Sequence, residues 1–251
     1  MDQIQHKYVE SRGLKLHLAG TGVSDSVVVF LHGFPEIWYS WRHQMIAVAK
    51  AGYRAIAPDF RGYGLSEIPQ EPEKASFNFG ARPGYLFAIL HPERVRGVVA
   101  IGVSFLPPGP SLAFAGQLPE GFYILRWQKP GRAEADFGRL EVKNVIRNIY
   151  ILFSKSEIPI EPEDKRNHGL VKKISQASLY EKSGFHTALQ VPYRSINEQF
   201  GMEQYISSEK AKEYVPDVEL TSLPEGTLFA QEQFPEQVKL LIKFLSKHNH
   251  V

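Results

Sequence analysis

Apolar positions in the first part of the chain repeat with a period that is typical of strands. Residues 4–10 and 14–20 alternate between apolar and polar side chains, so we expect them to form an N-terminal β-hairpin. Residues 27–31, Val-Val-Val-Phe-Leu, form an uninterrupted apolar run, which predicts a buried strand at the centre of a parallel sheet. His-Gly-Phe-Pro follows directly, and its Gly and Pro predict a sharp turn at the end of this strand.

The spacing of apolar residues changes to that of a helix after this turn. It predicts a helix over residues 40–50, with Ser40 as a suitable N-cap and Gly52 where a helix commonly ends. Residues 53–57 then predict another strand. The order strand, helix, strand with short connections predicts a right-handed crossover that makes the two strands parallel.

The whole pattern predicts an α/β protein with a mostly parallel sheet, flanked by helices and interrupted by a helical insert. A helix over 82–90 and a strand over 95–103 continue the core. We expect three parts, namely a first core part at 1–105, a helical lid (cap) at 106–195 and a C-terminal core part at 196–251. The remaining predicted elements are helices at 121–127, 133–137, 140–153, 174–183, 202–212 and 235–247 and a short strand at 217–223.

Composition and charge exclude several classes of protein. The 251 residues suffice for one large α/β domain with an inserted lid. With 29 basic and 27 acidic residues, the net charge of +2 favours neither a nucleic-acid nor a membrane partner. The N-terminus lacks an apolar signal segment, no apolar run could span a bilayer, and the absence of Cys excludes disulfides and thiolate metal sites. We expect a cytoplasmic protein without metal or cofactor, and the sequence predicts no particular oligomeric state.

Two long blocks of sequence carry a family resemblance. The first is His32-Gly-Phe-Pro-Glu-Ile-Trp-Tyr-Ser-Trp-Arg-His43, and the second is Gly52-Tyr-Arg-Ala-Ile-Ala-Pro-Asp-Phe-Arg-Gly-Tyr-Gly-Leu-Ser66. In these blocks the chain resembles the α/β-hydrolase superfamily and, within it, the soluble epoxide hydrolases of plants. The resemblance implies an α/β-hydrolase fold with a helical lid and the hydrolysis of an epoxide to a vicinal diol. It also implies a small hydrophobic epoxide or a related ligand as the partner.

By this resemblance, the first block supplies the oxyanion hole of the active site. Phe34 would offer its backbone N–H to the developing negative charge, and Phe79, which follows the nucleophile's position, would offer a second N–H. Trp38 is implied to line the substrate site. We expect the proline of the turn to be cis, as it is in the family. Structural roles in the turn are predicted for His32, Gly33 and Pro35.

Two stretches are too short for parts that the family's chemistry requires. Residues 67–77 contain two prolines and cannot supply both a helix and a strand. Counting back from Gly80, Asn78 occupies the position of the nucleophile, although it could equally be a junction residue at the edge of the gap, and Ser76 replaces the first Gly of the tight turn. Asn is a neutral amide, whereas the reaction needs a carboxylate nucleophile. Residues 196–206 form a second gap, because they lack the apolar run for a strand that ends in the relay acid.

The position of the catalytic base is also changed, whereas two proton donors survive. Leu228 stands where the family has its catalytic His, and none of the nine His residues lies between 224 and 229. Leucine cannot move a proton. Tyr123 and Tyr193 match the family's lid tyrosines, which hydrogen-bond the epoxide oxygen. A phenol suits this role because it donates to an ether oxygen and protonates the developing alkoxide.

Three interpretations follow from the sequence. The chain could be a working epoxide hydrolase, a non-catalytic small-molecule-binding protein (a pseudoenzyme), or a truncated product of splicing or of a gene model that folds poorly. Losing buried strand residues, at about 1.5–3 kcal/mol each, competes with a total stability of roughly 5–15 kcal/mol, which favours the third interpretation over the second. We expect no measurable epoxide hydrolysis from the chain as written.

Overall fold

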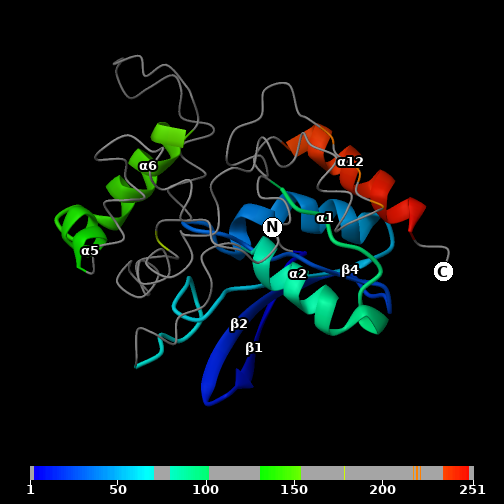
Figure 1. Ribbon diagram of the computed structural model, residues 1–251, viewed down its shortest axis with the longest axis horizontal. Coiled ribbons are helices and arrows are strands. Elements are labelled where there is room, and N and C mark those ends of the chain that lie inside the picture. Colours follow the sequence, from blue (N-terminus) through cyan, green and yellow to red (C-terminus); the bar gives the residue numbers. More distant parts are fainter. Residues whose placement is uncertain are drawn as a thin grey trace.

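The described part of the protein consists of a mixed β-sheet, helices beside it and a further pair of helices set to one side (Figure 1). The computed structural model describes residues 3–70, 80–101, 131–153 and 234–248, together with positions 178, 217, 219 and 221. The elements are β1 (Gln5–Ser11), β2 (Leu14–Thr21), β3 (Val27–Val29), the 3₁₀ helix η1 (Trp38–Trp41), α1 (Arg42–Lys50), β4 (Arg54–Pro58), α2 (Ala81–Leu90), the 3₁₀ helix η3 (Pro92–Arg94), α5 (Arg132–Phe137), α6 (Val142–Phe153) and α12 (Phe234–Lys247).

The sheet confirms the predicted hairpin and the predicted parallel pair. Its strand order is β1-β2-β4-β3, with β1 antiparallel to β2 and β2 antiparallel to β4. Strand β3 pairs with β4 in parallel, and Val28 lies opposite Ala55. Because α1 connects these two strands, the predicted strand–helix–strand unit is present.

The prediction that residues 27–31 form a buried, central strand is wrong in the described sheet. Only Val27–Val29 are assigned to β3, which lies at the edge of the sheet beside β4. Val27 and Val29 are 46% and 54% exposed, whereas Phe30 is buried. An apolar run is buried on both faces only where other elements cover both faces, and the edge position leaves the Val27 and Val29 face open.

Two local predictions also differ from the structure. Ser40 is not the N-cap of α1, because it lies inside η1 and its hydroxyl donates to the Ile37 carbonyl oxygen at 2.8 Å. Residues 95–101, predicted as part of a strand, form none. This segment packs against α12 instead, since a Cβ added at Gly97 would lie 2.7 Å from the Phe244 ring. Gly52 follows α1 with a φ of 91°, as expected for a Gly at a helix end.

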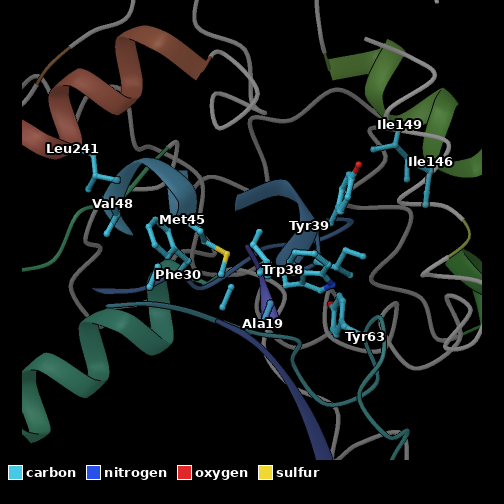
Figure 2. Packing of buried hydrophobic residues seen from close by; sticks show 14 of the residues in the cluster. Ala19, Phe30, Trp38, Tyr39, Met45, Val48, Tyr63, Ile146, Ile149 and Leu241 are labelled. Carbon is cyan, nitrogen blue, oxygen red and sulfur yellow. The ribbon is translucent and has the colours of Figure 1, made fainter. Parts of the chain in front are cut away.

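The buried core joins elements that are far apart in the sequence. Met45 and Val48 of α1 are fully buried, and the sheet presents small side chains to the same core, including Ala19, Ala55 and Ala57. Figure 2 shows Leu241 of α12 beside Val48, while Ile146 and Ile149 of α6 lie near Tyr39. Large side chains on the helix and small ones on the strands allow a close approach of the two layers.

The helices predicted at 82–90, 133–137, 140–153 and 235–247 are confirmed as α2, α5, α6 and α12. The elements predicted at 121–127, 174–183, 202–212 and 217–223 lie wholly or mostly outside the described residues. The boundaries of the lid therefore stay a prediction, although α5 and α6 fall within its range. No helix in the described part is both long and apolar enough to cross a membrane.

A buried amide pair fixes the C-terminal helix to α1. Gln44 Nε2 donates to Gln237 Oε1 at 2.6 Å, and both side chains are buried. We expect Gln237→Leu to lower the free energy of unfolding by about 1–3 kcal/mol, because the buried hydrogen bond from Gln44 Nε2 to Gln237 Oε1 is lost. Urea denaturation followed by circular dichroism would measure the change.

The matched control is the double variant Gln44→Leu with Gln237→Leu. It removes both partners and retains similar side-chain volumes, so it should recover most of the lost stability. A double variant that is less stable than the single variant would contradict this account.

Candidate functional site

The turn after β3 is the centre of the candidate site. The Phe34–Pro35 peptide is cis, as the sequence predicted. Pro35 is buried and Phe34 is half-buried against the main core cluster. The turn leads into η1, whose first residue, Trp38, donates its backbone N–H to Asp59 Oδ1 at 2.9 Å. The loop after β4 therefore holds the far end of the turn.

His32 ties the near end of the turn to the same loop. Its Nδ1 lies 3.0 Å from the Gly33 carbonyl oxygen, and its Nε2 accepts the Phe60 backbone N–H at 3.0 Å. A backbone N–H can only donate, so the ring is neutral with its proton on Nδ1. The ring packs between Phe60 and Tyr63, with centroids at 4.5 and 5.0 Å. Burial lowers the pKa of His32, and the Asp59 carboxylate opposes this only in part.

Asp59 accepts hydrogen bonds from three separate elements. Its Oδ1 accepts the Trp38 N–H, while its Oδ2 accepts the Leu65 N–H at 3.0 Å and lies 2.9 Å from His17 Nδ1. Both Asp59 and His17 are fully buried. Hydrogen bonds to a charged acceptor are stronger than neutral ones, so this carboxylate sets the positions of η1, β2 and the 60–66 loop together.

The loop from Asp59 to Ser66 closes on itself around this carboxylate. Ser66 Oγ donates to the Asp59 carbonyl oxygen at 2.7 Å and accepts the His17 backbone N–H at 2.9 Å. Gly64 has a φ of 52°, and a Cβ at this position would lie 2.5 Å from Asp59 Oδ2. Glycine is required here both for its backbone conformation and for the close approach of the carboxylate.

The start of α2 reaches the other side of the turn. Gly80 is the N-cap of α2, and a Cβ at this position would overlap the Leu31 carbonyl oxygen and lie 2.6 Å from the His32 carbonyl oxygen. The backbone of α2 thus begins in direct contact with the end of the β3 segment. The sequence predicts that Phe34 and Phe79 share one site. This prediction requires the start of α2 to lie close to the turn, as it does at Gly80.

Side chains that follow the turn pack around it. Trp38 is buried among the rings of His6, His17 and Tyr39, with centroids 4.9 to 6.1 Å away. The Arg42 guanidinium lies 4.3 Å from the centroid of the Tyr39 ring, and its Nη1 donates to the Tyr39 carbonyl oxygen at 2.9 Å. Trp38 therefore has a packing role, and its contact with a ligand stays a prediction.

The structure brings together only some of the residues that the sequence singled out. His32, Gly33, Phe34, Pro35 and Trp38 form one continuous segment around the turn. The remaining predicted site residues, Asn78, Phe79, Tyr123, Tyr193 and Leu228, lie outside the described residues, and their roles stay predictions. Within the described residues, no group of three or more His, Cys, Asp or Glu side chains could hold a metal ion.

Sequence reasoning missed the residues that hold the turn in place. Asp59 was read as part of a family block and His17 as one position of a hairpin. The alternation gave no signal, because His17 falls in its polar phase between Leu16 and Leu18, and only the structure shows that the face with His17 and Ala19 is the buried one. A buried His of this kind needs a partner. The sequence alone could not identify that partner as Asp59, which is 42 residues away.

Comparison with known proteins supports the resemblance. The family model described as alpha/beta hydrolase fold matches residues 26–81. Epoxide hydrolase 2 of Siraitia grosvenorii is 34% identical over 193 residues, covering 66% of this chain and 60% of that protein. Epoxide hydrolase 1 of the same plant is 33% identical over 194 residues, covering 66% and 61%. The chain thus spans about 60% of the length of these two curated relatives.

Two further similarities extend along almost the whole chain. The AB hydrolase superfamily protein YfhM of Bacillus subtilis (strain 168) is 28% identical over 289 residues, which cover 96% of this chain and 98% of that protein. The crystal structure of an epoxide hydrolase from Vigna radiata superposes with a TM-score of 0.82 at 28% identity, covering 98% of this chain and 99% of the other. The predicted fold class and the predicted resemblance are both confirmed.

Gly80 offers a direct test of the contact between α2 and the turn. We expect Gly80→Ala to lower the free energy of unfolding by about 1–3 kcal/mol, because the new methyl group would overlap backbone carbonyl oxygens that cannot easily move. Gly84→Ala is the matched control, since its nearest neighbour is the Leu31 Cδ1 methyl at 3.6 Å. The control should be neutral or stabilising by up to about 1 kcal/mol, because Ala favours a helix over Gly. Equal effects of both substitutions in chemical denaturation would contradict the contact.

Because the pKa of His32 is lowered in the folded state, we expect the free energy of unfolding to decrease in acid. The folded pKa of His32 lies below the unfolded value near 6.5, so the unfolded chain takes up this proton first as the pH falls. The contribution of His32 is therefore present above about pH 6.5 and is lost progressively below it. Urea midpoints measured at about pH 7.5 and 5.5 should differ less in His32→Gln than in the wild type, whereas the exposed control His91→Gln should behave like the wild type. A His32→Gln variant with the full acid loss would contradict the prediction.

Proposed function

Because the chain has the α/β-hydrolase fold and resembles plant epoxide hydrolases, we propose that it is a catalytically silent relative of these enzymes. It keeps the turn of the oxyanion hole and lacks the groups that open and hydrolyse an epoxide. The reaction from which it descends is the addition of water to a small hydrophobic epoxide to give a vicinal diol. The relatives named above as epoxide hydrolases support this reaction class.

The observation that carries the proposal is the identity of two residues in otherwise family-like surroundings. Opening an epoxide through a covalent ester needs an ionised carboxylate, and Asn78 offers a neutral amide. Hydrolysis of that ester needs a base to take a proton from water, and Leu228 offers none. An oxyanion hole stabilises charge that develops during such a reaction, but it cannot start the reaction.

The length of the chain supports the same conclusion. The alignment with the Bacillus subtilis protein spans 289 residues, more than the 251 residues of this chain, so that relative has stretches without a counterpart here. The sequence places the missing stretches at 67–77 and 196–206, where the nucleophile's strand and the relay acid are expected. On this proposal the relay acid has no residue in the chain, and restoring single groups would recover little activity.

The activity test uses the purified full chain with an aromatic epoxide, and diol is quantified by chromatography against a buffer control. We expect no diol above the uncatalysed rate. Asn78→Asp with Leu228→His should also stay at this rate, because the relay acid and the strand that positions the nucleophile are still lacking. A cooperative thermal unfolding transition should be recorded for each sample, so that a silent folded protein is distinguished from a poorly folded product.

One positive result would overturn the proposal. If the wild type forms diol and the double variant Tyr123→Phe with Tyr193→Phe abolishes it, a nucleophile other than Asn78 is at work in a lid-covered site. The Tyr→Phe changes remove only the hydroxyl groups, so they test proton donation with little change in packing.

A further inference from the structure

A line of three polar side chains runs from the surface of β1 into the interior behind the turn. His6 is exposed on β1, His17 is fully buried on β2, and Asp59 is fully buried after β4. His6 Nδ1 lies 2.9 Å from His17 Nε2, and His17 Nδ1 lies 2.9 Å from Asp59 Oδ2. The two rings stack with centroids 5.1 Å apart. None of these three side chains has a part in the epoxide chemistry proposed above.

The register of the hairpin explains why the two His side chains meet. His6 lies opposite Ala19 and Tyr8 lies opposite His17, so all four side chains share one face of the β1–β2 pair. His6 and His17 are therefore diagonal neighbours, which lie within reach of each other in an antiparallel pair. The edge of the Trp38 ring closes the other side of His6, with centroids 4.9 Å apart.

The hydrogen bond between the two rings allows only one proton on the line between their nitrogens. If His17 Nε2 is protonated, His6 Nδ1 must accept, and if His6 Nδ1 is protonated, His17 Nε2 must accept. When both rings are imidazolium ions, both facing nitrogens carry a proton and no lone pair lies between them. The bond is then lost, and two like charges face each other in a stack.

We propose that His6, His17 and Asp59 form an acid-sensitive latch that ties β1 to the loop holding the oxyanion turn. With one proton between the two rings, the latch is closed, and β1 covers His17 and the Asp59–Trp38 contact. Once both rings are imidazolium ions, no lone pair is left between them, so the bond breaks and β1 is released from the buried pair. The latch acts on the positions of β1 and Trp38, so it does not depend on whether the chain hydrolyses an epoxide.

The surroundings favour a neutral His6. Burial lowers the pKa of His6 most, the neighbouring His17 lowers it further, and Asp59 opposes both effects. The other ionisable groups near the line are Tyr8, whose ring lies 5.5 Å from His17, Lys15, whose Nζ lies 5.1 Å from the Tyr8 ring, and Glu67, which accepts the Lys15 backbone N–H. The folded pKa of His6 lies below the unfolded value, so the latch is closed above about pH 6.5 and opens as the pH falls.

The test is hydrogen exchange of the full-length chain at about pH 7.5 and 5.5, corrected for the intrinsic effect of pH on exchange. The amides to follow are those of the β1–β2 ladder and the Trp38 N–H. In the wild type we expect their protection to fall several-fold in acid, at roughly tenfold for each unit by which folding lowers the pKa. A protection that is unchanged between the two pH values would overturn the proposal.

Two substitutions of His6 distinguish the effect of its hydrogen bond to His17 from the effect of its protonation. His6→Asn places an amide where Nδ1 lies, which can donate to His17 or accept from it but does not titrate. Its acid loss of protection should be several-fold smaller than that of the wild type, and the loss that remains is the contribution of His32, which both proteins retain. His6→Phe keeps the ring but removes the bond, so at neutral pH its ladder should already exchange as fast as that of the acidified wild type. His91→Asn, on an exposed side chain outside the line, should match the wild type at both pH values.

Two results with the His6 variants would contradict the latch. If His6→Asn loses as much protection in acid as the wild type, the titrating group lies elsewhere, since His32 is present in both proteins. If the β1–β2 ladder of His6→Phe is as protected as that of the wild type at neutral pH, the bond between His6 and His17 does not stabilise β1. Should either variant fail to fold, the ring nitrogen-15 signals of His6 in the wild type decide the matter. A titration midpoint at or above about 6.5 would then overturn the proposal.

Discussion

The carboxylate of Asp59 is the interaction on which the rest of the described site depends. It is fully buried, and it joins the start of η1, the middle of β2 and the loop that leads to Ser66. A buried charge without partners is very costly, whereas one with several donors fixes each donor in place. The backbone position of Trp38 and the close approach of Gly64 both involve this one group.

The turn depends on fewer segments of the chain than the family's chemistry does. Its geometry depends on residues 32–38 and 59–66, which are close in space and present in the chain. Catalysis would depend on groups from several distant segments that act as a unit, so the loss of one group disables the others. The geometry of the turn alone therefore does not decide whether the chain is active, and neither does the fold.

The open side of the sheet has a further physical consequence. Val27 and Val29 on β3 are exposed, and so are four apolar side chains of α2, namely Leu86, Phe87, Ile89 and Leu90. Exposed apolar surface of this kind costs solubility and favours association. It is what an α/β sheet would show if an element that normally covers this face were lacking, in line with the short stretch at 67–77. Measurements of the solubility and the unfolding of the chain would therefore distinguish among the three interpretations.

The sequence by itself determined the elements that depend on local spacing. It predicted the hairpin, the parallel pair of strands, and the helices α2, α5, α6 and α12, because hydrophobic period, Gly and Pro act over a few residues. The cis proline was implied by the family resemblance instead. It also predicted the family resemblance and the two changed catalytic positions. Those positions lie outside the described residues, so their roles still rest on the sequence alone.

Only the tertiary structure decided which side chains are buried and which partners they meet. The apolar run at 27–31 predicts a central strand, yet the strand lies at the edge of the described sheet and exposes Val27 and Val29. His17 is a polar residue that becomes fully buried, because Asp59 arrives beside it from 42 residues further along the chain. Burial and long-range hydrogen bonds depend on which elements cover a surface, and no local pattern in the sequence carries that information.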